Sequence, residues 1–126
     1  LGEQPVGTSL LVETGHPRHP YVAHTPTMRV PMPIAHTDNV YRAMWGMLLA
    51  VHAHNRDHAR SITTVAVPGL GTGAGRVPFA EAARQMALAY RHFVAPPRSL
   101  DWDVATARQE AIRYGGDLGL EWPPET

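Results

Sequence analysis

Four glycines alternate with other residues at positions 69, 71, 73 and 75, directly after Pro68. We call this segment, residues 69–75, the glycine turn. Glycine has no Cβ and accepts positive φ values, so a turn of this composition can aim successive backbone N–H groups at one point. A single glycine is enough for a tight connection, and four at alternate positions exceed that need. The pattern therefore predicts an anion site, most often a site for phosphate.

The segments on either side place the glycine turn between a strand and a helix. Residues 62–67 (ITTVAV) are rich in β-branched side chains and predict a strand. Pro78 suits the first turn of a helix, where its missing N–H costs nothing. Apolar residues at helical spacing mark the buried face of that helix: Ala83, Met86, Ala87, Tyr90 and Phe93. The start of this helix adds unpaired N–H groups and the positive end of the helix dipole to the anion site.

Two familiar phosphate motifs fit the turn poorly. A P-loop requires Lys and then Ser or Thr after its last glycine, whereas Gly75 is followed by Arg76 and Val77. The dinucleotide pattern G-x-G-x-x-G/A is formally met at positions 69, 71 and 74. It also needs a second strand that ends in an acidic residue about twenty residues further on, and two prolines stand where that strand would begin.

Elsewhere the chain alternates between strand and helix patterns. Residues 8–13 and 21–25 read as short strands. Thr37, Asp38 and Asn39 form a cluster of good helix N-caps, and an apolar stripe follows until the polar residues 55–60. Such alternation predicts an α/β fold with a mixed or mostly parallel sheet, and we expect residues 62–67 to form a central strand paired on both sides.

The C-terminal part has a different character. Ser99 is expected to cap a short helix over residues 100–113, and glycines and prolines predict a loop after it. We therefore expect a core domain over residues 1–95 and a helix-and-loop tail over residues 96–126.

Composition excludes several classes of site. The 126 residues are enough for one compact domain. Eleven basic and eleven acidic side chains balance, which argues against nucleic acid as a partner, because non-specific binding needs a surplus of Lys and Arg. The chain has no cysteine, so disulfides, thiolate metal sites and cysteine nucleophiles are removed together. No apolar run reaches membrane-spanning length, and we expect a cytoplasmic protein with no membrane partner.

Four segments, in order along the chain, resemble the macro-domain family. PVGTSLLVETG resembles a family strand, and YVAHTPTMR resembles the strand whose histidine precedes a proline-containing bend. ITTVAVPGLGTGAGRVP resembles the family's strand, proline and second ligand loop, and AEAARQM resembles the alanine-rich helix after that loop. The segments TPTMRVP and PGLGTGAG together are most similar to a branch of the macro-domain family that is described as phage-tail-like.

The resemblance implies a three-layer α/β/α fold that binds ADP-ribose or a related nucleotide diphosphate. By similarity, backbone amides of the glycine turn would hold the diphosphate, and the candidate ligand-binding residues are Gly71, Thr72, Gly73, Ala74, Gly75, Arg76, Val77 and Arg29. Arg29 is included because it follows a strand end, where α/β proteins tend to bind ligands. An ordinary surface salt bridge is an equal alternative for it.

The sequence departs from the family in three places. In the family, an aromatic residue of this loop often covers a ribose. The matching stretch here, from Gly75 to Val77, contains no aromatic residue. The family's first ligand loop and adenine-binding aspartate would lie upstream of residues 8–13, where the chain has only seven residues. The strand that follows the family's last helix is not visible. We therefore expect an N-terminally incomplete fold whose unpaired sheet edges favour self-association.

No residue pattern identifies a catalytic group. His54 and His58 have metal-ligand spacing without the companion glutamate of H-E-x-x-H, so neither a metal site nor a cofactor is predicted. His24 is expected to be a hydrogen-bonded core residue, and Asp38 a helix cap. Three functions remain open: a binding module for ADP-ribose, a hydrolase for ADP-ribosyl or phosphoester linkages, and a degenerate interaction domain that binds no nucleotide.

Overall fold

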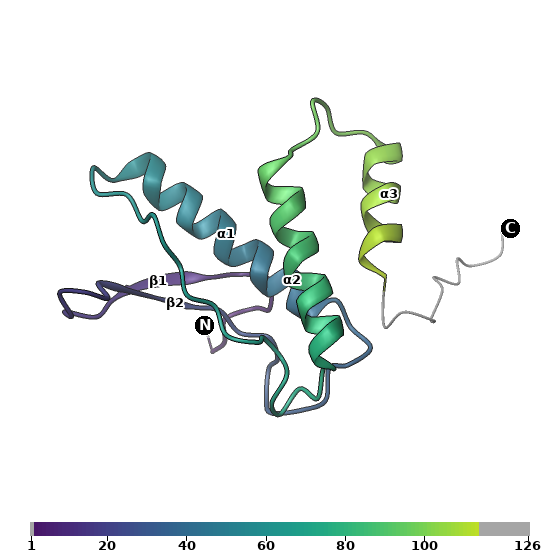
Figure 1. Cartoon of the computed structure of the whole chain (residues 1–126), viewed down its shortest axis with the longest axis horizontal. Helices are drawn as coiled ribbons and strands as arrows, with labels where there is room; N and C mark the ends of the chain where they lie inside the picture. Colours follow the sequence, from purple (N-terminus) through teal and green to yellow (C-terminus); the bar gives the residue numbers. More distant parts are fainter. Residues whose placement is uncertain (1, 114–126) are drawn as a thin grey trace, which may run out of the picture.

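The computed structural model describes residues 2–113, and within them it contains three helices and one two-stranded sheet (Figure 1). The elements, in chain order, are β1 (Leu10–Glu13), β2 (Tyr21–His24), α1 (Asn39–Asp57), α2 (Phe79–Val94) and α3 (Trp102–Ile112). Both strands and the first two helices lie where the sequence predicts them. Among residues 2–113, none of the helices combines the length and the apolar character that a transmembrane segment needs.

The sheet of the described chain is an antiparallel hairpin. β1 and β2 pair in a register that places Leu10 opposite His24 and Glu13 opposite Tyr21. A mixed or mostly parallel sheet is therefore not found within residues 2–113. The two strands are joined by a short loop with two prolines, and a connection this short permits only antiparallel pairing, because parallel strands need a crossover.

Residues 62–67 do not form the predicted central strand. Asn55 of α1 holds Ile62 at both backbone groups, since its Oδ1 accepts the Ile62 N–H at 2.7 Å and its Nδ2 donates to the Ile62 C=O at 2.9 Å. Beyond Ile62 the chain runs extended past the hairpin (Figure 1) without a strand partner among the described residues. β-Branched residues stabilise a strand only when a neighbouring strand pairs with their segment. No strand pairs with residues 62–67 within the described chain.

Helices α1 and α2 pack against each other and hold the described core. One buried cluster contains Ile34, Val40, Val77 and Ala82, and a second contains Tyr41, Leu88, Ala89 and Ile112. The first cluster lies beneath the glycine turn, and the second joins the start of α1 and the middle of α2 to α3. The core that supports the turn therefore combines Val40 and Ala82 of the helices with Ile34 and Val77 of the adjoining loops.

Gln85 ties the two helices together from inside this core. Its side chain is 0% exposed. Its Oε1 accepts the N–H of Tyr41 at 2.9 Å, and its Nε2 donates to the C=O of Thr37 at 2.9 Å. The first N–H groups of a helix lack partners within the helix, so Gln85 of α2 supplies the cap that α1 needs. The side chain of Asp38, the predicted cap, makes no capping bond.

Helix α3 also packs on the core. Asp101 caps it, because its Oδ1 accepts the N–H of Val104 at 2.8 Å, and the predicted cap Ser99 lies outside the helix. Arg84 of α2 donates to the C=O groups of Ala111 and Ile112. The glycines and prolines predicted to form a loop after α3 lie outside the described residues.

Candidate functional site

The glycine turn is folded by its own hydrogen bonds. Thr72 donates its N–H to the Gly69 C=O at 3.3 Å, and its Oγ1 donates to the same oxygen at 2.7 Å. At the other end, the N–H of Arg76 bonds to Gly73 at 3.0 Å and that of Val77 to Gly71 at 3.0 Å. These bonds close the turn at both ends, and they leave its middle residues as the ones that can face a ligand.

Two of the four glycines are needed for packing. Gly71 has a φ of +72°, and a Cβ there would lie 2.9 Å from Val40, 3.0 Å from Val77 and 3.2 Å from Ile34. A Cβ on Gly75 would lie 2.5 Å from the Gly71 carbonyl oxygen. These contacts seat the turn on the first core cluster. Glycine is required at positions 71 and 75 because a Cβ would collide with neighbouring atoms, so ligand binding is not needed to explain these two glycines.

Gly73 lies on the open side of the turn. A Cβ built on it would meet no atom within 4 Å, and its φ is not positive. The positive φ that glycine permits is used at Gly71 and not at Gly73, so a larger side chain at Gly73 would act by filling space. Neither Gly73 nor the exposed Ala74 donates its N–H to any group in the described part of the chain. The N–H groups of Gly69, Leu70, Gly71 and Gly75 also donate to no group among residues 2–113, so Gly73 and Ala74 are the two free donors that lie on the exposed middle residues of the turn.

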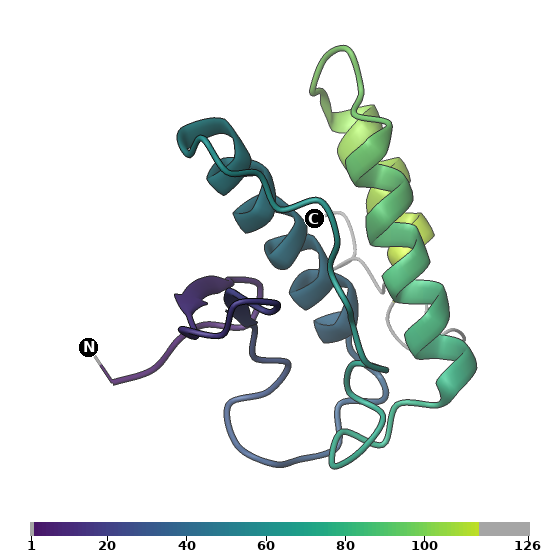
Figure 2. The same cartoon turned by 60° about the vertical axis from the view of Figure 1, so that its left-hand side comes forward.

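A cavity of about 580 Å³ lies between the glycine turn and the first turns of α2. Gly69 and Thr72 line it from the turn, and Phe79, Ala82, Ala83 and Met86 line it from the helix. Figure 2 shows the turn next to the N-terminal ends of α1 and α2. The first N–H groups of α2 have no partner within the helix, so the cavity adjoins a second source of anion-binding donors.

Phe79 was missed by the sequence reasoning. It begins α2, lines the cavity and is 81% exposed, more than a large apolar ring is expected to be in a folded domain. The sequence could have indicated this role, because Phe79 directly follows Pro78 and a residue at the start of a helix lies beside the preceding turn.

The structure separates the other predicted site residues. Arg76 is exposed next to the turn and has a φ of +54°. Val77 is buried in the core and supports the turn from below. Arg29 makes a bidentate ion pair with Glu3, with Nε to Oε2 at 2.7 Å and Nη2 to Oε1 at 2.9 Å. Arg29 is thus engaged in the surface salt bridge that was its alternative assignment.

Asp38 lies at the start of α1, two residues before Val40, which touches the turn. Burial raises the pKa of its carboxyl, and the nearby charge of Arg42 lowers the pKa in part. Since Asp38 does not cap the helix, its charged form is held by few local partners. This carboxyl is the one in the neighbourhood of the turn whose pKa is moved upward.

The three histidines considered as candidates, His24, His54 and His58, all make hydrogen bonds within the described chain. His54 and His58 stack with ring centroids 4.2 Å apart, His54 Nε2 pairs with the Arg60 C=O, and His58 Nδ1 pairs with the His54 C=O. His24 Nδ1 lies 2.6 Å from Gln4 Oε1 on the exposed surface. His24 is therefore hydrogen-bonded as predicted, but it is not a core residue. Among residues 2–113, no group of three or more potential ligands could hold a metal ion.

Comparison with known proteins gives one match. No curated protein and no solved structure is significantly similar to the chain. The family model of the macro domain matches residues 1–86, which include the hairpin, α1, the glycine turn and the first half of α2. The match covers more than half of the 126 residues, and on this evidence the chain belongs to the macro domain family.

Proposed function

We propose that this macro domain is a binding module for ADP-ribose or a related nucleotide diphosphate, with the diphosphate held against the glycine turn. One observation carries the proposal: the amides of Gly73 and Ala74 are unpaired within the described chain, on a turn whose shape is fixed by the core beneath it. Preorganised backbone N–H groups beside a helix N-terminus form an anion site. Membership of a family known for binding ADP-ribose supports this choice of ligand.

Two side chains next to the turn would complete the contacts. Arg76 is exposed and can donate to a phosphate oxygen, since none of its side-chain groups is bonded within the described chain. The exposed ring of Phe79 can stack on the ribose or the base, because it faces the cavity beside the turn. Phe79 would then do the work of the loop aromatic that the sequence lacks.

We further propose that this site belongs to a three-layer α/β/α fold. The helices α1 and α2 and the hairpin are the parts of such a fold that the described residues contain. In that arrangement residues 62–67 would be paired as a strand when another strand lies beside them. A strand so paired would hold Pro68 and the start of the glycine turn more rigidly than the described chain does.

The test is calorimetric titration of ADP-ribose into the chain and into Gly73→Val. A valine side chain would enter the open space above the turn, so we expect affinity to fall by about tenfold or more, equivalent to about 1.4 kcal/mol. Ala87→Val is the matched control, because it adds a branched side chain to an exposed position of α2 that does not line the cavity.

Three comparisons complete this experiment. Thermal unfolding shows that each variant is folded before it is titrated. Adenosine without phosphate should bind much more weakly than ADP-ribose if the turn holds the diphosphate. Release of ADP-ribose from a modified protein would instead place the chain with the hydrolases. A folded Gly73→Val that binds ADP-ribose as tightly as the parent would overturn the proposal.

A further inference from the structure

Helix α3 is attached to the other helices over a small area. Ile112 is the buried residue of α3, and it packs against Tyr41 and Leu88 in the second core cluster. At the other end of the helix, Trp102 is 87% exposed. A helix that buries so few side chains belongs to the part of a protein that can open locally while the rest stays folded.

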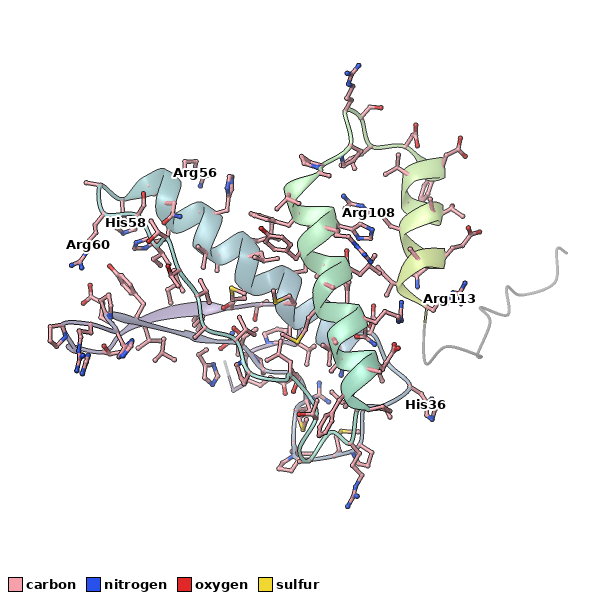
Figure 3. The ribbon with its side chains drawn as sticks, viewed as in Figure 1. His36, Arg56, His58, Arg60, Arg108 and Arg113 are labelled. Carbon is pink, nitrogen blue, oxygen red and sulfur yellow. The ribbon has the colours of Figure 1, made fainter. Side chains whose placement is uncertain are left out.

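Two arginines add polar contacts to α3. Arg84 of α2 donates to the C=O groups of Ala111 and Ile112 at 3.0 and 2.7 Å. Arg108 of α3 lies over the ring of Trp45 in α1, with its Cζ 5.3 Å from the ring centroid. Figure 3 shows Arg108 on the side of α3 that faces α2. The first contact holds the C-terminal end of α3, and the second holds its middle.

Arg108 is brought close to a histidine that lies between α1 and α2. His92 of α2 has its Nδ1 2.8 Å from the hydroxyl oxygen of Tyr41, and the Tyr41 ring stacks on Trp45 with centroids 6.3 Å apart. Arg108 lies on the same Trp45 ring, and its charge acts on both Tyr41 and His92. The three helices therefore meet at a cluster in which His92 can gain a proton in mild acid.

The charges that face His92 are mainly positive. Burial lowers its pKa first, and Arg108 from α3 and Arg91 from α2 lower it further. α1 contributes the Tyr41 hydroxyl, and Asp38, which precedes α1, acts on that hydroxyl. Neither Arg91 nor Arg108 makes an ion pair within residues 2–113. A proton on His92 would therefore place a positive charge beside two others that no carboxylate compensates directly.

The position of each charge decides which of them can move. Arg91 and His92 belong to α2, and the buried Gln85 fixes that helix to α1 through two hydrogen bonds. Arg108 belongs to the helix with the small attachment. Detachment of α3 would remove both the burial of His92 and the charge of Arg108, so His92 binds a proton more tightly in that state. A ligand that binds one state more tightly shifts the population towards it, and here the ligand is the proton.

We propose that α3 is a strap that is released when His92 binds a proton, while α1 and α2 stay packed against each other. Release is favoured as the pH falls from the ordinary histidine pKa of 6.5 towards the lower pKa that His92 has while α3 is docked. The released molecule exposes the Trp45 ring and Leu88, so it presents an apolar face in acid that it covers at neutral pH.

The experiment measures the distance between α2 and α3 in the whole chain. The sequence has no cysteine, so two can be introduced and labelled with nitroxides. One pair is Ala87→Cys in α2 with Thr106→Cys in α3, and the reference pair is Ala87→Cys with Arg56→Cys in α1, all at exposed positions. Pulsed electron paramagnetic resonance gives both distances at about pH 7.5 and about pH 5. We expect the ratio of docked to released α3 to fall by about tenfold or more in acid, with the reference distance unchanged.

Two histidine variants test the origin of this change. His92→Gln can still hydrogen-bond to Tyr41 but takes up no proton, so α3 should stay docked in acid. His52→Gln is the matched control, because His52 is an exposed histidine of α1 whose charge is not among those that act on His92. It should release α3 as the parent does. Acid release in His92→Gln would refute the proposal.

A third variant tests the repulsion itself. Arg108→Met keeps a contact with the Trp45 ring without a charge, so α3 should be released at a lower pH than in the parent. This shift decides the question if His92→Gln does not fold, which circular dichroism shows beforehand. An unchanged α2–α3 distance in the parent, or an unshifted release in Arg108→Met, would overturn the proposal. If both label pairs lengthen together, the chain unfolds as a whole and α3 is not a separate switch. No nucleotide is present, so the result is independent of the proposed function.

Discussion

The glycine turn and the segment directly before it are neighbours in sequence with opposite kinds of support. The turn rests on Ile34, Val40 and Val77, and its ends are closed by backbone bonds. Residues 63–67 have no backbone partner in the described chain and are mostly exposed. The shape of the candidate site is thus held by the core beneath it and by its own backbone bonds, and the segment with the highest strand propensity adds little to it.

The most damaging substitution should be Gln85→Leu. It leaves the Tyr41 N–H and the Thr37 C=O buried without partners and releases the start of α1 from α2. We expect a loss of about 3 kcal/mol in the free energy of unfolding, measured by urea denaturation. Gln109→Leu is the control, because the buried Nε2 of Gln109 has no hydrogen-bond partner among residues 2–113. If both variants lose the same stability, the bonds made by Gln85 are not what joins the helices.

The next largest effect should come from Gly71→Ala. The positive φ disfavours any Cβ, and the added methyl would lie 2.9 Å from Val40. We expect a loss of about 2 kcal/mol in urea denaturation. Gly73→Ala should change stability by less than about 0.5 kcal/mol, because its Cβ points into open space. A large cost at Gly73 would show that the open side of the turn is also packed.

A pair of valines compares the two regions directly. Val77→Ala removes two buried methyl groups from beneath the turn and should cost about 1.5 kcal/mol. Val65→Ala, in the extended segment, should cost less than about 0.5 kcal/mol, because the side chain is exposed. Hydrogen exchange provides a second measurement, with fast exchange at residues 63–67 and protection in α1 and α2. Protection of residues 63–67 in the isolated chain would contradict the unpaired backbone described above.

The smallest effect should be a pH dependence that arises from His92. Burial lowers its pKa below the ordinary value of 6.5, and Arg108 and Arg91 lower it further. The unfolded chain therefore binds this proton more readily, so stability should fall as the pH drops from about 6.5 through the folded pKa. His92→Gln should flatten this part of the stability curve, measured by thermal unfolding between pH 5 and 7. An unchanged slope would assign the acid sensitivity to another group.

The sequence predicted the local elements better than their assembly. β2, α1 and α2 were found from turn residues, helical spacing and the position of Pro78, all of which act over a few residues. The buried face expected for α2 was wrong, because Ala83, Ala87 and Tyr90 are exposed, and the residues that are buried are Ala82, Gln85, Leu88 and Ala89. The pairing of the sheet was not predicted correctly, because the pattern ITTVAV indicates a strand whether or not a neighbouring strand is present. Of the predicted cap cluster of α1, Thr37 accepts the Asn39 N–H and Asp38 makes no capping bond, because Gln85 reaches the Tyr41 N–H from another helix.

The sequence also predicted the candidate site only in part. Alternating glycines indicated a turn with free amides, and Gly73 and Ala74 have them. The pattern could not show that Gly71 and Gly75 are required by packing, because that depends on Ile34 and Val40 far away in sequence. Nor could it place Arg29, which is engaged by Glu3.

The bond between Gln85 and Tyr41 joins residues 44 positions apart, and the glycine turn lies inside the loop that it closes. Closing a loop costs chain entropy before the contacts that reward it are made. We therefore expect the turn to acquire its shape late in folding, together with the docking of α2 on α1. During synthesis, a nascent chain that has emerged only as far as the turn would lack the proposed nucleotide site. The site would form once residue 85 has left the ribosome, and ligand present at that moment would favour the folded state.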